Sequence, residues 1–393
     1  MPTSRRFAIV VLAFVALFAP SEAIVQCART LVAVARSAPR LAAADLPTRL
    51  TDQEFWSLTE SLSEPGGFFR SDNFLSNERG YQQIIPDLLE RIGPGSGGVY
   101  LGVGPEQNFA YIVALRPKMA FIIDIRRGNL HEHLLYKALF EMSATRADFL
   151  SRLFSRSRPA GLGAGSTVAE LFNAYDGIQR SDDLYQENLS AVIDWLTKRH
   201  GFPLSSDDVR GIEYVYHDAF FIGGPQLDYS MGGGTGGGGG GNSPTYRELM
   251  LANDGYGRNR GYLASEENFA AIKDLEAKNL LVPVVGNFGG PKAIRAVGQY
   301  VKDGGGTVVA FYFSNVEQYL TQDGIWGNFC ASVATLPLDD TSTFIYSGRG
   351  GPNAVTRGRP TRFGGGGGGG GGLQTTIRPI RRDLALCAPA GIQ

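Results

Sequence analysis

The chain has few of the residues that bind metals or form covalent cross-links. Among its 393 residues are only three cysteines, Cys27, Cys330 and Cys387, and four histidines. Three cysteines are too few for a fold held together by disulfides; one bridge can form, and the sequence does not select the pair. His131 and His133 are two positions apart, which does not place both imidazoles on one helix face. We therefore expect no metal site.

The chain also has no excess of charge of either sign. Its 37 lysines and arginines nearly balance its 38 aspartates and glutamates, so no overall field favours a nucleic-acid partner. The apolar stretch from Phe7 to Phe18 has 12 residues, too few for a settled transmembrane helix. We expect neither a nucleic-acid partner nor a stable membrane span.

The N-terminus has the pattern of an export signal. Arg5 and Arg6 precede the apolar stretch, and Ser21-Glu22-Ala23 follows it as a small-x-small cleavage site. This pattern predicts a signal peptide over residues 1–23 and a periplasmic or secreted protein. An uncleaved anchor or a buried helix is the alternative, which would leave the protein membrane-anchored or cytoplasmic.

Glycine is abundant, with 53 residues, many of them in two low-complexity runs. Gly232–Gly241, interrupted by Thr235, and Gly364–Gly372 have no side chains to bury and the most backbone entropy to lose. We predict an unpacked insert at 232–241 and a disordered Gly/Arg-rich tail at 349–393. Residues 24–67 are predicted to be a helical or linker segment, with a helix at 52–62, and residues 68–348 an α/β domain.

Five continuously apolar runs alternate with helical patterns along this domain. Runs that are apolar on both faces suit central parallel strands, because helices cover both sides of such a sheet. The alternation predicts a doubly wound, mostly parallel sheet flanked by helices. The segment "CASVATLPLDDTSTFIYSG" predicts a terminal antiparallel hairpin. The five expected strands are Val99–Val103, Ala120–Ile125, Ile212–Tyr216, Leu280–Gly286 and Thr307–Ser314.

Ligands of open α/β sheets bind at the carboxyl ends of the strands, so the residues there are candidates for a site. The first strand ends in Gly102-Val103-Gly104, where the backbone can approach a ligand, and the next helix directs its amides to it. Gln107 stands where a dinucleotide fingerprint has its third glycine, which disfavours a nicotinamide or flavin cofactor. Asp124 ends the second strand, 20 residues past Gly104, and suits a ribose; a cap on the following turn is the alternative.

The later strand ends also carry polar groups. After the third expected strand, Asp218 can bind an adenine amino group, with Ala219 leaving room for the ring, and His217 is a candidate base or a structural residue. Asn287 follows the fourth strand. Asn315 follows the fifth and is a candidate substrate contact, with Glu317 and Tyr319 as further catalytic candidates.

The order of these features resembles the class I, Rossmann-like S-adenosylmethionine-dependent methyltransferases. The resemblance implies S-adenosylmethionine as the cofactor, with contacts at Gly102, Gly104, Asp124, Asp218, Ala219 and Asn287, and it implies little about the substrate. Our first hypothesis is a methyltransferase that acts on a small molecule. The motifs "SDNFLSNE", "YLGVGPEQNF", "YLASEENF" and "SNVEQYL" look like an uncharacterised bacterial group with a methyltransferase-like fold. The sequence "GNFGGP", in place of Asn/Asp-Pro-Pro-Tyr, argues against amino methylation of a base or glutamine.

Two further segments lie next to this expected site. "SDNFLSNERGY" precedes the first strand and either folds over the pocket, with Asn73, Glu78 and Tyr81 reaching the substrate, or is a capped helix start. Arg126 and Arg127 either meet a carboxylate or phosphate or are solvated. Because the cofactor is made in the cytoplasm, the signal peptide raises a second hypothesis, an exported non-catalytic protein that keeps the fold for binding or as a scaffold.

Overall fold

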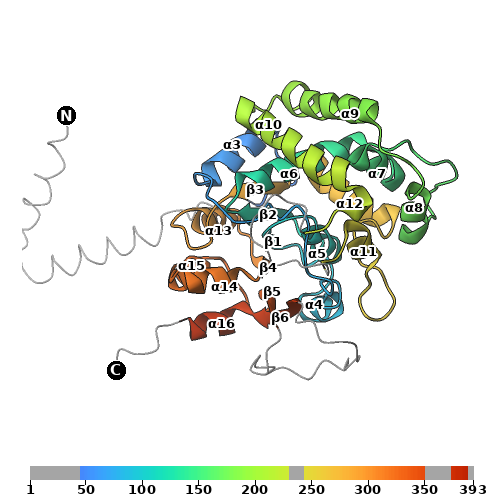
Figure 1. The fold of residues 1–393 in the computed structure, drawn as a ribbon. Coiled ribbons are helices and arrows are strands. Elements are labelled where there is room, and N and C mark those ends of the chain that lie inside the picture. The colour runs from blue at the N-terminus through green and yellow to red at the C-terminus, as the bar shows by residue number, and fades with distance from the viewer. Residues whose placement is uncertain (1–44, 230–242, 350–372, 388–393) are drawn as a thin grey trace, which may run out of the picture. The chain divides into compact units, whose positions relative to one another are not determined.

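The computed structural model describes residues 45–229, 243–349 and 373–387, which contain one six-stranded sheet in the order β3-β2-β1-β4-β5-β6 (Figure 1). β1 to β5 are parallel, and β6 is antiparallel to β5. The prediction of an α/β fold with a mostly parallel sheet and a terminal antiparallel pair is confirmed. The strands are β1 Val99–Gly102, β2 Met119–Asp124, β3 Leu281–Val285, β4 Val308–Ser314, β5 Thr343–Arg349 and β6 Leu373–Pro379.

Four of the five predicted strands are present, because their runs are apolar on both faces and are buried from both sides. Every residue of β1, β2 and β3 is buried. β1 lies at the centre: Leu101 pairs with Phe121 of β2 on one side and with Phe311 of β4 on the other. The carboxyl ends of β1, β2, β3 and β4 therefore lie along one edge of the sheet.

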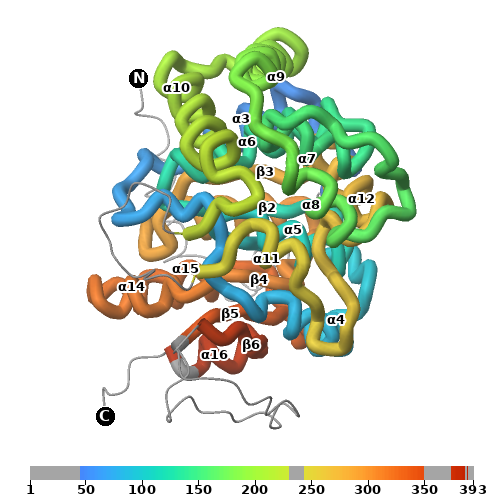
Figure 2. The backbone as a smooth tube through the Cα atoms, turned by 45° about the vertical axis from the view of Figure 1, so that its right-hand side comes forward, coloured from blue at the N-terminus to red at the C-terminus, as the bar shows by residue number. Residues whose placement is uncertain are grey.

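Helices cover both faces of this sheet. Figure 1 shows α5 and α6 on one side of the strands and α13 and α15 on the other. In both Figure 1 and Figure 2, α9 and α10 lie at the β3 end of the sheet, whereas β6 and α16 lie at the opposite end. The α-helices are α3 Asp52–Leu62, α4 Ile85–Ile92, α5 Gln107–Leu115, α6 Arg127–Met142, α7 Arg146–Phe154, α8 Val168–Tyr175, α9 Asp182–Asp194, α10 Ser206–Tyr214, α11 Tyr246–Leu251, α12 Glu266–Ala277, α13 Ala293–Asp303, α14 Val316–Gln322, α15 Trp326–Val333 and α16 Ile380–Leu386.

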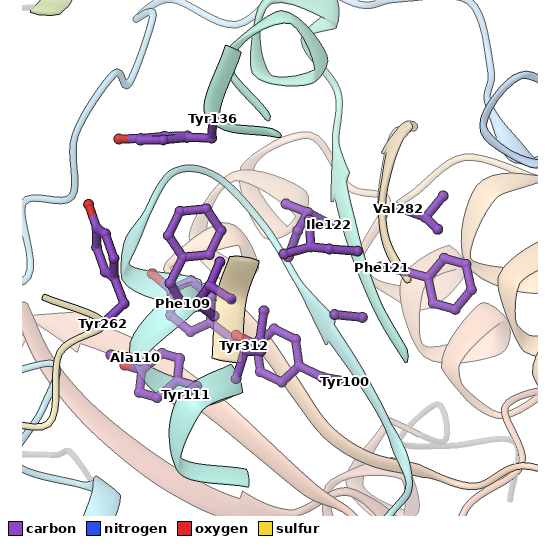
Figure 3. Packing of buried hydrophobic residues seen from close by; sticks show 14 of the residues in the cluster. Tyr100, Phe109, Ala110, Tyr111, Phe121, Ile122, Tyr136, Tyr262, Val282 and Tyr312 are labelled. Atoms are coloured by element: carbon purple, nitrogen blue, oxygen red, sulfur yellow. The ribbon is translucent and has the colours of Figure 1, made fainter. Parts of the chain in front are cut away.

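Aromatic side chains fix α5 against the sheet and against the neighbouring helices (Figure 3). Phe109 of α5 lies edge-on to Tyr136 of α6 at 5.3 Å and to Tyr262 at 5.2 Å between ring centroids. Tyr111 lies 5.4 Å from Tyr312 of β4. Each of the two edge-to-face pairs of Phe109 adds about 0.5–1.5 kcal/mol to the stabilisation from the area that it buries. They hold the start of α5, and with it the turn that follows β1, in a fixed place.

The third predicted strand is wrong, because Ile212–Tyr216 is helical. It lies in α10 and the π-helical turn η2, Val215–Phe221. The buried apolar residues, Ile212, Val215, Tyr216, Ala219 and Phe220, recur at spacings of three and four, which is the period of a helix. Ser205 caps the helix by accepting a hydrogen bond from the Asp208 amide. The run Ile212–Tyr216 alone is too short to show this helical period, and it therefore resembled a strand.

The predicted hairpin is only half right. Cys330 and Val333 belong to α15, where Phe329 is also buried, and β5 pairs in parallel with β4. The antiparallel partner of β5 is β6, which comes from the tail that we expected to be disordered; residues 373–387 instead form β6 and α16. A Cys330–Cys387 disulfide joins α15 to the residue that follows α16.

Several sequence predictions fall outside the described residues: the signal peptide at 1–23, Cys27, and both glycine runs. The predicted helix at 52–62 is confirmed as α3. In the described ranges 45–229, 243–349 and 373–387, no helix is both long and apolar enough to cross a membrane.

Candidate functional site

A cavity of about 290 Å³ opens at the carboxyl ends of β1 to β4. Its walls are the turns that follow these four strands together with residues 68–78, which precede α4. β1 pairs with β2 on one side and β4 on the other, so the cavity lies where the strand order reverses. Crevices at this point are the usual ligand sites of open α/β sheets.

The turn after β1 brings backbone to the cavity. Gly104 lines it with φ +75°, a left-handed conformation that suits glycine. Gly102 does not line it: a Cβ there would lie 2.0 Å from Asn108 Oδ1, so this glycine makes room for Asn108 rather than for a ligand. Asn108 Nδ2 donates to the carbonyls of Val103 (2.9 Å) and Pro105 (2.7 Å) and so holds the turn.

Three buried titratable groups lie behind this turn. His133 Nε2 donates to the carbonyl oxygen of Gly104 (3.0 Å), and burial lowers the pKa of His133 to about 4. Neither carboxyl oxygen of Glu106 or Glu132 has a hydrogen-bond partner among the described residues. Burial raises the pKa of Glu106 to about 8 and also raises the pKa of Glu132. Glu106 is thus predominantly protonated at neutral pH.

Asp124 lines the cavity, as predicted, but its carboxylate is bound by Arg126. Oδ1 accepts hydrogen bonds from the Arg126 backbone amide (2.9 Å) and Nε (3.0 Å), and Oδ2 accepts one from Nη2 (2.8 Å). Both residues are buried, at 5 % and 8 % exposed. Arg127 has a different role: its Nε donates to Asp208 Oδ1 (2.7 Å), outside the cavity.

The segment before α4 reaches the cavity through Asn73 and Glu78. Asn73 has φ +47°, and its buried Oδ1 has no hydrogen-bond partner in the described residues. Glu78 accepts hydrogen bonds from Tyr312 (2.7 Å), Ser314 (2.5 Å) and Thr375 (3.3 Å). Burial raises the pKa of Glu78, and these hydroxyl donors partly offset the effect.

Tyr81, which we predicted to touch the substrate, is instead a core residue. Its side chain is 1 % exposed, does not line the cavity, and donates to the carbonyl oxygen of Leu249 (3.2 Å). The chain turns between Glu78 and Tyr81. Glu78 therefore reaches the cavity wall, whereas the Tyr81 ring packs edge-on against the ring of Tyr111.

Asn287, Asn315 and Tyr319 all line the cavity, in agreement with their placement at strand ends. Asn287 follows β3 and Asn315 follows β4, one strand earlier in the count than we expected, because the third predicted strand is a helix. Arg70 Nη2 donates to the Tyr319 hydroxyl (3.1 Å), and its guanidinium lies 5.1 Å from the ring centroid. Glu317 lies outside the cavity, 3.7 Å from Arg378 of β6.

His217, Asp218 and Ala219 do not belong to this site. All three lie in η2 and none lines the cavity. The His217 and Asp218 side chains are 43 % and 45 % exposed and lie 3.6 Å apart, whereas Ala219 is buried. Their assignment as base and adenine contacts depended on the strand that is absent.

Sequence reasoning missed several residues of the cavity wall. Tyr312 lies on β4, where an apolar run concealed it, and Arg70 and Tyr229 lie in segments without a motif. Gln107 was noted only as a missing glycine. Its Nε2 donates to the Tyr312 hydroxyl, and its buried Oε1 has no partner among the residues that the structure describes.

The charged and polar groups do not assemble into a metal centre. Within residues 45–229, 243–349 and 373–387, no group of three or more His, Cys, Asp or Glu side chains could hold a metal ion.

Comparison with known proteins gives one family. A family model described as "Domain of unknown function (DUF7790)" matches residues 73–163 and 244–356, just over half of the chain. The matched segments contain β1 to β5 and most of the cavity wall, and they leave out residues 164–243, which include α8, α9 and α10. The search of curated proteins gave no match.

Proposed function

The chain belongs to the family described as Domain of unknown function (DUF7790), and because that description assigns no activity, we propose a function from the geometry of the cavity. The proposed activity is transfer of a methyl group from S-adenosylmethionine to a small molecule. The observation that carries the proposal is the cavity at the β1–β4 switch point, with Gly104 at the end of one strand and Asp124 at the end of the next.

The fold supports an adenosyl ligand. The sheet order is that of doubly wound nucleotide-binding sheets, and the final antiparallel strand fits the closing hairpin of the class I methyltransferases that the sequence resembles. With the strand count corrected, Asn287 takes the place after the third strand that we had given to Asp218. Asn315 takes the place after the fourth strand, next to the methyl-transfer position.

The Asp124 carboxylate has few lone pairs left to accept hydrogen bonds from a ribose. A carboxylate offers about four lone-pair sites, and Arg126 fills three of them. One ribose hydroxyl can therefore donate to Asp124 as it stands, and a second requires that Arg126 give up one hydrogen bond.

Methyl transfer from a sulfonium needs mainly correct positioning, with a base where the acceptor must lose a proton. Of the three catalytic candidates from the sequence, only Tyr319 lines the cavity. We assign the proton-acceptor role to Glu78, which was expected only to bind substrate. It lines the cavity, and burial raises its pKa, which makes its carboxylate a stronger base than that of an exposed glutamate.

Calorimetry of the full chain with S-adenosylmethionine and S-adenosylhomocysteine tests the proposal. We expect micromolar binding of both, weakened at least tenfold by Asp124→Asn. The matched control is Asp218→Asn, an identical change at a half-exposed side chain outside the cavity, which should leave affinity unchanged. A folded protein that binds neither compound would exclude the methyltransferase function.

A second candidate function is that of an exported, non-catalytic binding protein. It is supported by the Cys330–Cys387 disulfide, since such bonds persist in oxidising compartments, and by the occupation of Asp124 by Arg126. Cell fractionation distinguishes the two: a processed, oxidised chain outside the cytoplasm supports export, and a full-length, reduced chain confined to the cytoplasm contradicts it.

A further inference from the structure

We propose that the cavity selects a ligand that carries a carboxylate or phosphate group, and that the Arg126 guanidinium binds this anion. The inference rests on the proposed function in using the same cavity, and it adds the chemical class of the ligand. Arg126 was expected to be solvated more often than to bind an anion; the structure instead places it in the cavity wall.

The hydrogen bonds of Arg126 leave donors for a ligand. A guanidinium has five N–H groups, and Asp124 accepts from one on Nε and one on Nη2. The other three, including both on Nη1, have no protein partner among the described residues. The side chain is only 9 % exposed, so bulk water cannot solvate these groups freely. Unused donors on a side chain that lines the cavity favour a ligand that accepts hydrogen bonds.

The chemistry of these donors favours an anion. A planar guanidinium matches the oxygens of carboxylate and phosphate, and charge-assisted hydrogen bonds to them are about twice as strong as neutral ones. Asp124 fixes the guanidinium by its Nε edge, which pre-organises the Nη1 edge before a ligand arrives. The pairing that reduces the room for a ribose on Asp124 therefore prepares Arg126 for an anionic group.

Besides Arg126 and Asp124, the charged groups of the cavity wall are Arg70, Glu78 and Asp323. Tyr229, which also lines the cavity, interacts electrostatically with Tyr319, Arg126 and Arg70. Arg70 is exposed at the cavity wall and is the second cation there.

Arg127 provides the contrast. It follows Arg126 directly, but Asp208 accepts from its Nε at 2.7 Å and Glu60 lies 3.5 Å from its Nη2. It does not line the cavity. Of these two adjacent arginines, only Arg126 has unused donors at the cavity wall, so Arg127 serves as the control in a test.

Calorimetry of the full chain with paired probes tests the inference. The phosphate arm compares adenosine with its 2′-, 3′- and 5′-monophosphates, and the carboxylate arm compares S-adenosylhomocysteine with its methyl ester. We expect the anionic member of at least one arm to bind at least tenfold more tightly than its neutral counterpart. The arm in which the preference is found identifies the anion.

The decisive variant is the double change Asp124→Asn with Arg126→Gln, which keeps the shape of the pair and leaves no buried charge unpaired. It should remove the anion preference, while Arg127→Gln should retain it; circular dichroism confirms that both fold. Equal binding of anionic and neutral probes by the wild type, or a preference that survives the double change, would overturn the inference.

The outcomes separate this inference from the proposed function. A phosphate-bearing nucleoside that binds through Arg126, with no binding of S-adenosylmethionine or S-adenosylhomocysteine, supports the inference and excludes the methyltransferase. Binding of S-adenosylmethionine and S-adenosylhomocysteine without any anion preference supports the methyltransferase and overturns the inference. No binding of any probe excludes both.

Discussion

The carboxyl group of Glu106 is buried behind the turn that follows β1. Neither of its oxygens has a hydrogen-bond partner among the described residues. Its pKa of about 8 in the folded chain, against 4.5 ordinarily, means that the folded state holds a proton that the unfolded state releases. The stability that this provides is complete below pH 4.5 and is lost as pH rises to about 8. His133, with a lowered pKa of about 4, acts in the opposite direction between pH 4 and 6.5.

We predict that the free energy of unfolding falls between pH 6.5 and 8, and that Glu106→Gln reduces this fall by about 1 kcal/mol per pH unit. The glutamine cannot ionise, so the variant should be more stable than the wild type at pH 8. Denaturant titrations at several pH values measure the effect.

Glu141→Gln is the matched control, a second glutamate on the same side of the sheet. Burial raises its pKa, but hydrogen bonds from His200 and Lys137 together with the Lys137 charge lower it to about 2. This variant should lose stability throughout the range without changing the slope between pH 6.5 and 8. A Glu106→Gln slope equal to that of the wild type would contradict the assignment.

At the level of single residues, the sequence predicted that Gly104, Asp124, Asn287, Asn315 and Tyr319 lie together, because all five follow strand ends, and all five line the cavity. Their contacts with a ligand stay predictions. It did not find the Asp124–Arg126 pair. Whether an arginine two positions after an aspartate turns back onto it depends on the extended backbone at Arg126, φ −90° and ψ 130°, which the residue types do not specify.

At the level of elements, the C-terminal strand is the clearest departure from expectation. β6 follows a glycine run and contains two threonines and an arginine, so it has too little apolar surface to be recognised as a strand. It is nevertheless part of the site, because Thr375 donates to Glu78 (3.3 Å). Its partner β5 and the Cys330–Cys387 disulfide hold it in place, and both are tertiary features.

Removal of the disulfide should therefore destabilise the fold. Chain entropy for a bridge between residues 57 positions apart corresponds to about 4 kcal/mol, and measured losses are commonly about 2–5 kcal/mol. We expect Cys330→Ser with Cys387→Ser to lower the free energy of unfolding by about 2–4 kcal/mol in denaturant titrations. A reducing agent should produce the same loss in the wild type and none in the variant. Equal stability of both proteins would show that β6 and α16 are held without the bridge.

At the level of the whole molecule, the α/β class was predictable because buried parallel strands are apolar on both faces, and four of the expected strands are where the sequence places them. The long helical insert between β2 and β3 was the obstacle. An apolar run in α10 and η2 was short enough to resemble a strand. Counting it as the third strand shifted the expected numbers of the later strands by one and placed Asp218 at a site that it does not reach. The family match leaves out residues 164–243, which include α10, and contains strands β1 to β5.

The central claim is that the cavity at the ends of β1 to β4 holds an adenosyl ligand. The most direct measurement is a crystal structure of the full chain grown with S-adenosylhomocysteine at saturating concentration. The account predicts density for the ligand in this cavity, with a ribose hydroxyl on Asp124 and the backbone of Gly104 beside it. Ligand density at another place, or none in the cavity of a well-ordered crystal, would contradict it.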